Sequence, residues 1–136
     1  MKRIVLLVAA SLIAYGVMAR DLAPIVNHDN VPVVTGSGKA ASAQAVGVAI
    51  ANAAKSGKRQ WTVTPTAPEK MRATYNVRQH AIVVDIDYSA KAYSIHYAGS
   101  DNMKYGEVGG QKVIHPFYNN WVDELKRGIN TELGKL

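Results

Sequence analysis

The segment that decides the fold is "AIVVDIDYSAKAYSIHY", which spans residues 81–97. Apolar and polar side chains alternate along both of its halves. Such alternation is typical of antiparallel strands that bury one face and expose the other. When Tyr88 is placed opposite Tyr93, Ile86 falls opposite Ile95, and the apolar side chains share one face. A shift of one residue would turn them to the other face, so the pattern predicts both a hairpin and its register.

The same alternation is found upstream, in residues 60–64 and 71–77. We therefore expect four antiparallel strands that are joined as successive hairpins and share one apolar face. In the upstream hairpin, our alignment places Arg72 beside Asp87 on the polar face, where opposite charges form an ion pair.

Two segments have a helical period instead. Residues 42–56 place small and aliphatic side chains at helical spacing, with Ser42 as an N-cap, and Gly47 would let a neighbouring segment approach closely. Pro116 suits the first position of a final helix. The apolar stripe of that helix consists of Tyr118, Trp121, Val122, Leu125, Ile129 and Leu133. The predicted fold class is α+β: a four-stranded antiparallel sheet with two helices on one face, in the order α-β-β-β-β-α.

The start of the chain predicts export. A positively charged beginning precedes a short apolar run, and Val17 and Ala19 stand at the −3 and −1 positions of a signal peptidase site. We interpret residues 1–19 as a cleaved signal peptide, because the apolar run is too short to span a bilayer comfortably. We expect a periplasmic or secreted protein with no stable membrane insertion after cleavage. Residues 20–40 are expected to form an extended or flexible arm, and residues 41–136 a single α+β domain.

The amino-acid composition excludes several kinds of functional site. The chain contains no cysteine, which excludes disulfides, thiolate metal sites and a thiol nucleophile. The formal net charge is +6, and removal of Lys2 and Arg3 with the signal peptide leaves 14 basic and 10 acidic residues, a net charge of +4. This balance suits anionic envelope polymers or lipid head groups, although solubility alone also explains a charge of this size. Because the basic residues form no clustered stripe, nucleic acid is not an expected partner.

The histidines are the residues best suited to bind a metal, but none has the close spacing of a zinc motif. The best acid–histidine pair is Asp85 and His96, which the predicted register places opposite each other on the polar face. The sequence has no G-x-S-x-G elbow and no complete phosphate-binding loop. We therefore predict no catalytic residue, no metal and no cofactor.

Four short motifs occur in order along the chain: Arg-x-His at 78–80, Tyr-Ser-Ile-x-Tyr at 93–97, Ser-x-Asn at 100–102, and Ile-His-x-x-Tyr-Asn-x-Trp-Val at 114–122. In these motifs the chain resembles a family of small exported bacterial envelope proteins, many of them lipoproteins, whose role is uncharacterised. This chain departs from many members because it lacks the cysteine that would carry the lipid. The resemblance therefore implies a soluble periplasmic form and names no activity.

The candidate ligand-binding residues are Arg78, His80, His96, His115, Asn102 and Asn119. They belong to two candidate surfaces: the open polar face of the sheet, and a cleft where the glycine-rich segment 98–114 meets the predicted turn at Arg78 and the helix start at His115. The predicted function is a non-catalytic exported module that binds an envelope protein or an anionic cell-surface component. The alternative is a small-ligand or metal-binding periplasmic protein that uses its surface histidines.

Overall fold

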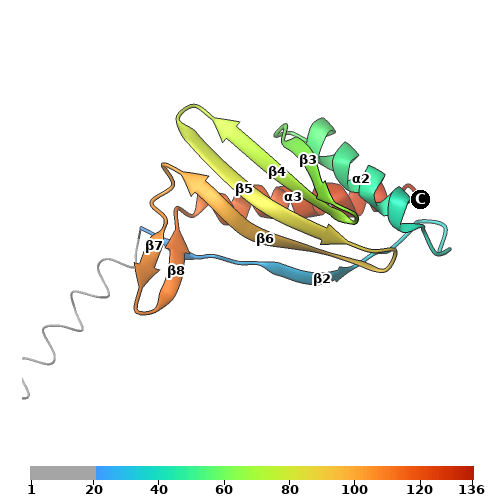
Figure 1. Cartoon of the computed structure of the whole chain (residues 1–136), viewed down its shortest axis with the longest axis horizontal. Helices are drawn as coiled ribbons and strands as arrows, with labels where there is room; N and C mark the ends of the chain where they lie inside the picture. The colour runs from blue at the N-terminus through green and yellow to red at the C-terminus, as the bar shows by residue number, and fades with distance from the viewer. Residues whose placement is uncertain (1–20) are drawn as a thin grey trace, which may run out of the picture.

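The computed structural model describes residues 21–136, so the predicted signal peptide lies outside the described residues. Figure 1 shows a twisted antiparallel sheet, two helices that pack along it, and a small second sheet at one end. The elements are β1 (Ala23–Pro24), β2 (His28–Pro32), α2 (Ala43–Ser56), β3 (Thr62–Ala67), β4 (Lys70–Val77), β5 (His80–Tyr88), β6 (Ala92–Asp101), β7 (Gly106–Val108), β8 (Gln111–Ile114) and α3 (Phe117–Leu133). None of the helices in this part of the chain is long and apolar enough to cross a membrane.

The main sheet has the strand order β2-β6-β5-β4-β3, and the small sheet has the order β1-β8-β7. The α+β class and the two helices are confirmed. The prediction of one four-stranded sheet in the order α-β-β-β-β-α is wrong. Within residues 21–136, β1 and β2 precede α2, and a further hairpin, β7–β8, lies between β6 and α3 in the chain. The four predicted strands are β3 to β6, and β2 adds a fifth strand at the β6 edge.

The β5–β6 hairpin has the predicted register, with Ile86 opposite Ile95. Beyond this pair the register shifts at a bulge, after which Val83 pairs with Gly99. A bulge inserts an extra residue without ending the ladder, and glycine in a strand often marks one. The ladder therefore continues to Asp101, through residues whose composition had indicated a flexible connection.

The β4–β5 register differs from the predicted one by two residues. Val77 pairs with His80, which leaves a turn of only two residues, Arg78 and Gln79. Arg78 has a φ of 55°, the left-handed conformation that a tight hairpin turn requires at its first central residue. The predicted alignment, which placed Arg72 beside Asp87, left a longer loop at this position. The shorter turn is not evident from the sequence, because arginine is uncommon in a left-handed conformation.

The segment 20–40 was predicted to be an extended or flexible arm, and its described part contributes β1 and β2. In Figure 1 it runs along the lower edge of the main sheet, and β2 pairs with β6 from His28 onward. The side chain of Asn119, on α3, ties down its beginning. The Asn119 carboxamide oxygen accepts the N–H of Val26 at 3.1 Å, and its nitrogen donates to the carbonyl of Pro24 at 2.8 Å. Because these hydrogen bonds involve backbone groups, they can hold a segment whose sequence shows no apolar periodicity.

The helices pack on the apolar face of the main sheet. The predicted stripe of α3 is buried throughout, at Tyr118, Trp121, Val122, Leu125, Ile129 and Leu133. It joins Ile86 and Ile95 in one hydrophobic core, and burial of each such aliphatic side chain contributes about 1.5–3 kcal/mol. Ser42 caps α2 as predicted, since its hydroxyl accepts the N–H of Ala45 at 3.1 Å. This packing fixes the position of the first turns of α3, where the candidate site lies.

Candidate functional site

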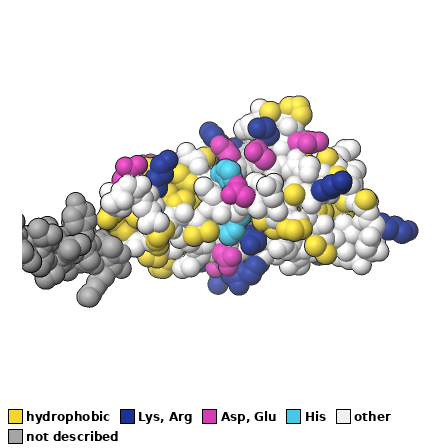
Figure 2. All heavy atoms as spheres, turned by 90° about the horizontal axis from the view of Figure 1, so that it is seen from below, with side chains coloured by type: hydrophobic (Ala, Val, Ile, Leu, Met, Phe, Trp, Pro, Cys, Tyr) yellow, Lys and Arg dark blue, Asp and Glu magenta, His cyan; other side chains and the backbone are white. Residues whose placement is uncertain are grey.

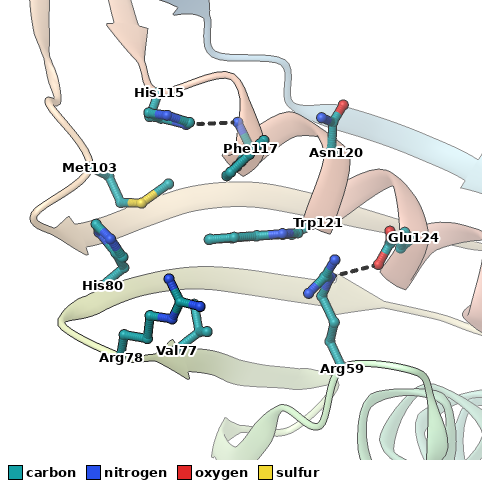
Figure 3. A pocket seen from close by; sticks show the side chains of 10 residues that line it. All are labelled: Arg59, Val77, Arg78, His80, Met103, His115, Phe117, Asn120, Trp121 and Glu124. Atoms are coloured by element: carbon teal, nitrogen blue, oxygen red, sulfur yellow. Dashed lines mark hydrogen bonds and ion pairs between the residues drawn. The ribbon is translucent and has the colours of Figure 1, made fainter.

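A cleft opens where the β4–β5 turn, the segment after β6 and the first turns of α3 meet (Figure 3). Its volume is about 440 Å³, which lies within the usual range for small-ligand pockets. The cleft is lined by Arg59, Val77, Arg78, His80, Met103, His115, Phe117, Asn120, Trp121 and Glu124. Segments that are far apart in the sequence therefore supply one set of basic, aromatic and amide side chains.

His80 is the first residue of β5, immediately after the tight turn that carries Arg78. Its ring nitrogen Nδ1 lies 2.7 Å from the backbone carbonyl oxygen of Asn102. A carbonyl oxygen can only accept, so Nδ1 must carry the proton. In the neutral ring, Nε2 of His80 is then an acceptor. The bond also ties the segment after β6 to the β4–β5 turn, and it closes one side of the cleft.

His115 lies between β8 and α3, where its ring satisfies one of the free N–H groups at the start of the helix. The Phe117 N–H donates to Nδ1 of His115 at 3.1 Å. Nδ1 is therefore an acceptor, and in the neutral ring Nε2 carries the proton. The rings of His115 and Phe117 are in contact, with centroids 4.6 Å apart. The two histidines of the cleft thus have opposite tautomers, each set by its backbone partner.

Aromatic side chains form the apolar part of the cleft. Trp121 is only 8% exposed, and its ring packs edge-on against Tyr75 at a centroid distance of 5.2 Å. Phe117 lies 5.8 Å from Trp121 and is 54% exposed. Met103, which is buried, completes this wall. The cleft therefore has a rigid aromatic floor and one ring that is open to water.

The positive charges at the two ends of the cleft differ in their partners. Figure 3 shows Arg59 beside Glu124 at one end of the Trp121 side chain and Arg78 near the other end. Arg59 forms an ion pair with Glu124 at 2.8 Å and lies 5.5 Å from the centre of the Trp121 ring. Hydrogen bonds to Tyr75 and to Glu124 raise its pKa above the ordinary value. By contrast, none of the ion pairs within residues 21–136 involves Arg78.

The structure brings together three of the six predicted site residues, Arg78, His80 and His115. Asn102 lies next to them and contributes its backbone carbonyl. Asn119 lies outside the cleft and holds the segment that leads into β2.

The sixth predicted residue, His96, lies on the opposite face of the sheet, where charged side chains pair with each other. Figure 2 shows histidine, acidic and basic side chains gathered in one band across the side of the molecule that carries β2. Asp85 stands opposite His96 as predicted, but the His96 ring bonds to Asp29. Arg72 pairs with Asp85 at 2.8 Å, and not with Asp87 as predicted. The Arg72 guanidinium holds the pKa of the Asp85 carboxyl below its usual value.

Several cleft residues were not among the predicted site residues. Trp121 was assigned to the apolar stripe of α3, where it does belong, and Arg59 and Glu124 had no distinguishing spacing. Phe117 offered the one usable signal, because it is a large aromatic residue at a helix start that falls outside the stripe.

Comparison with protein-family profiles, with curated proteins and with solved structures finds no match for this chain. Among residues 21–136 there is also no cluster of three or more histidine and carboxylate side chains that could hold a metal ion. The argument about function therefore rests on the geometry of the cleft.

Proposed function

We propose that the protein is exported to the periplasm, or secreted, and acts there as a non-catalytic binding module that holds an anionic component of the cell surface in this cleft. The observation that carries the proposal is Arg78: a guanidinium without a carboxylate partner among the described residues, at the edge of a hollow walled by Trp121 and Phe117. The export half of the proposal rests on residues 1–19, whose charged start, apolar run and small-residue end have the three-part form of a signal peptide.

The charge pattern of the cleft favours an anion. Glu124 neutralises Arg59, so Arg78 is the cation left to attract a ligand. Guanidinium groups bind carboxylates through paired hydrogen bonds, and bonds to charged groups contribute about 1.5–3 kcal/mol. The Nε2–H of His115 adds a further donor. The cleft therefore combines charge recognition with an apolar contact surface, as small-ligand sites usually do.

The residues that line the cleft support binding and not catalysis. They include no serine, threonine, tyrosine, lysine or cysteine that could act as a nucleophile. The Nδ1 atoms of His80 and His115 bond to backbone groups and not to a carboxylate that would orient a catalytic base. Glu124, the acidic residue of the lining, is held by Arg59.

The test is a binding experiment with the mature protein, residues 20–136. Its ¹H–¹⁵N spectrum is recorded with a panel of anions: acetate, benzoate, glucuronate, citrate and inorganic phosphate. We expect at least one of them to shift the Trp121 indole signal and the cleft amides in a saturable way. If none shifts these signals, or if the shifts persist without Arg78, the proposal is wrong.

Arg78→Asn is the decisive variant, because asparagine tolerates the left-handed conformation of residue 78 and keeps the turn while removing the charge. His96→Ala is the control, since it removes a histidine that pairs with Asp29 and does not line the cleft. We expect the first variant to lose the saturable shifts and the second to retain them.

A further inference from the structure

We infer that the ligand of this cleft is a carboxylate that also carries hydroxyl groups on a compact ring, the chemistry of a sugar acid such as a uronic acid. The inference rests on the proposed function and narrows it to a ligand class. The inference follows from three features of the cleft that a simple anion would not use together. They are two imidazoles that offer opposite hydrogen-bonding groups, the Arg78 guanidinium, which forms no ion pair within residues 21–136, and the exposed ring of Phe117.

The first feature is the acceptor on His80. Because Nδ1–H donates to the carbonyl of Asn102, the neutral ring offers a lone pair at Nε2. A lone pair repels the oxygens of a carboxylate or of a fully ionised phosphate, and it binds a hydroxyl hydrogen. A ligand that satisfies the neutral His80 ring therefore needs a donor of its own.

The second feature is the pair of donors. Arg78 supplies a planar fork that matches a carboxylate. His115 supplies Nε2–H, because its Nδ1 is occupied by the N–H of Phe117. Both groups line the same cleft as His80. The polar lining thus offers donors for an oxyanion together with an acceptor for a hydroxyl.

The third feature is the arrangement of the rings. Phe117 and Trp121 are tilted by 39° to each other, and His115 and Phe117 by 59°. Rings at these angles do not form the parallel walls that would sandwich a flat aromatic ligand. Phe117 is instead half exposed, and its exposed surface suits contact with the C–H groups of a saturated ring. Asn120 is exposed and also lines the cleft, and its amide group can donate and accept hydrogen bonds.

The size of the cleft limits the ligand further. A volume of about 440 Å³ lies at the lower end of the range for small-ligand pockets. One or two sugar units fit this space better than a long segment of polymer. The mature chain has a net charge of +4, which favours approach to an acidic polysaccharide whose end unit enters the cleft.

The test compares five probes by isothermal titration calorimetry with the mature protein. Glucuronate has both the carboxylate and the hydroxyls, glucose has only the hydroxyls, acetate and benzoate have only the carboxylate, and inorganic phosphate is an anion of different shape. We expect glucuronate to bind at least about tenfold more tightly than each of the others. If acetate, benzoate or phosphate binds as tightly as glucuronate, the inference is wrong while the proposed function stands. If no anion binds, both fail.

His80→Phe keeps a ring at this position but removes both the Nε2 lone pair and the Nδ1–H bond to the carbonyl of Asn102, so benzoate is used as the check that the cleft keeps its shape. We expect this variant to lose about tenfold in affinity for glucuronate and to bind benzoate unchanged, which also shows that its cleft is intact. Equal losses for both probes would contradict the assignment of His80 to a hydroxyl.

A final comparison of free glucuronate with a glucuronate oligosaccharide identifies the source of the ligand. Tighter binding of the oligosaccharide supports the end unit of a polymer. Equal binding supports a free sugar acid and excludes the polymer.

Discussion

Two helical glycines allow a quantitative test of how the helices pack. Gly47, buried in α2, faces the ring of Tyr88 at the end of β5. A Cβ atom at residue 47 would lie 2.6 Å from Oη, 2.7 Å from Cζ and 2.8 Å from Cε2 of Tyr88. These distances are well below the optimal separation of about 3.5–4.0 Å between carbon atoms. Because Tyr88 packs against the core, its ring cannot move away freely. Gly47→Ala therefore forces α2 or the ring to shift.

Gly128, in the middle of α3, is the matched control. A Cβ atom there would have the Cβ of Ala53 as its nearest neighbour, at an ordinary contact distance of 3.8 Å. Alanine stabilises a helix by about 1 kcal/mol relative to glycine. Nothing opposes this gain in Gly128→Ala, so we expect that variant to be about 1 kcal/mol more stable than the wild type. Overpacking costs about 1–3 kcal/mol, so Gly47→Ala should be about 1 kcal/mol less stable despite the same gain.

The free energy of unfolding is measured by urea titration of the mature protein, with the fluorescence of the buried Trp61 and Trp121 as the signal. The slope of unfolding free energy against urea should be the same for all variants. For a domain of this size, 1 kcal/mol corresponds to about 4 °C in melting temperature. In the background of Tyr88→Ala, the Gly47→Ala change should become stabilising, because the ring is gone. A Gly47→Ala variant at least as stable as the wild type would refute the packing of Tyr88 on α2.

Two further predictions concern the edges of the molecule. Asn119→Ala should lower the free energy of unfolding by about 1–2 kcal/mol, because it removes the hydrogen bonds to Val26 and Pro24; hydrogen exchange should show faster opening of β1 and β2, and unchanged anion binding in the cleft would separate this residue from the site. Asp85→Asn should reduce the decrease in unfolding free energy that acid causes, compared with the wild type. Arg72 lowers the pKa of folded Asp85, so this carboxylate contributes stability that is present above its unfolded pKa and lost as the pH falls through the folded value; urea titrations at neutral pH and at about pH 3 should show a smaller difference for the variant than for the wild type, and an equal difference would contradict the role of this pair.

The candidate site was predictable only in part. The sequence pointed to Arg78, His80 and His115 because they stand at a turn and at a helix start, where polar side chains are not needed for packing. We expected a cleft where these positions meet, but local periodicity could not establish the contact, since the β4–β5 turn and the start of α3 are separated in the chain by β5, β6, β7 and β8. It also could not show that Glu124 would neutralise Arg59 and leave Arg78 as the cation of the cleft.

For the fold, the sequence by itself determined what depends on local periodicity. The alternation around Ile86 and Ile95 specified a hairpin and its register, and the stripe that includes Trp121 specified the buried side of α3. The hydrophobic effect is the cause. If an apolar side chain were on the other face of its strand or helix, it would be exposed to water and would lose the free energy gained by burial.

Only the tertiary structure decided which distant segments pair. The strand β2 pairs with β6 through main-chain hydrogen bonds, and Asn119 on α3 holds the segment that precedes β2. Neither kind of bond produces a periodic pattern in the sequence. The two-residue turn at Arg78 likewise requires a left-handed backbone conformation, and an arginine in the sequence does not predict that conformation. Hydrogen bonds between remote backbone groups can form whatever the side chains are, whereas burial selects particular residues. The core could therefore be predicted from the sequence, while the strands at the sheet edge and the full lining of the cleft could not.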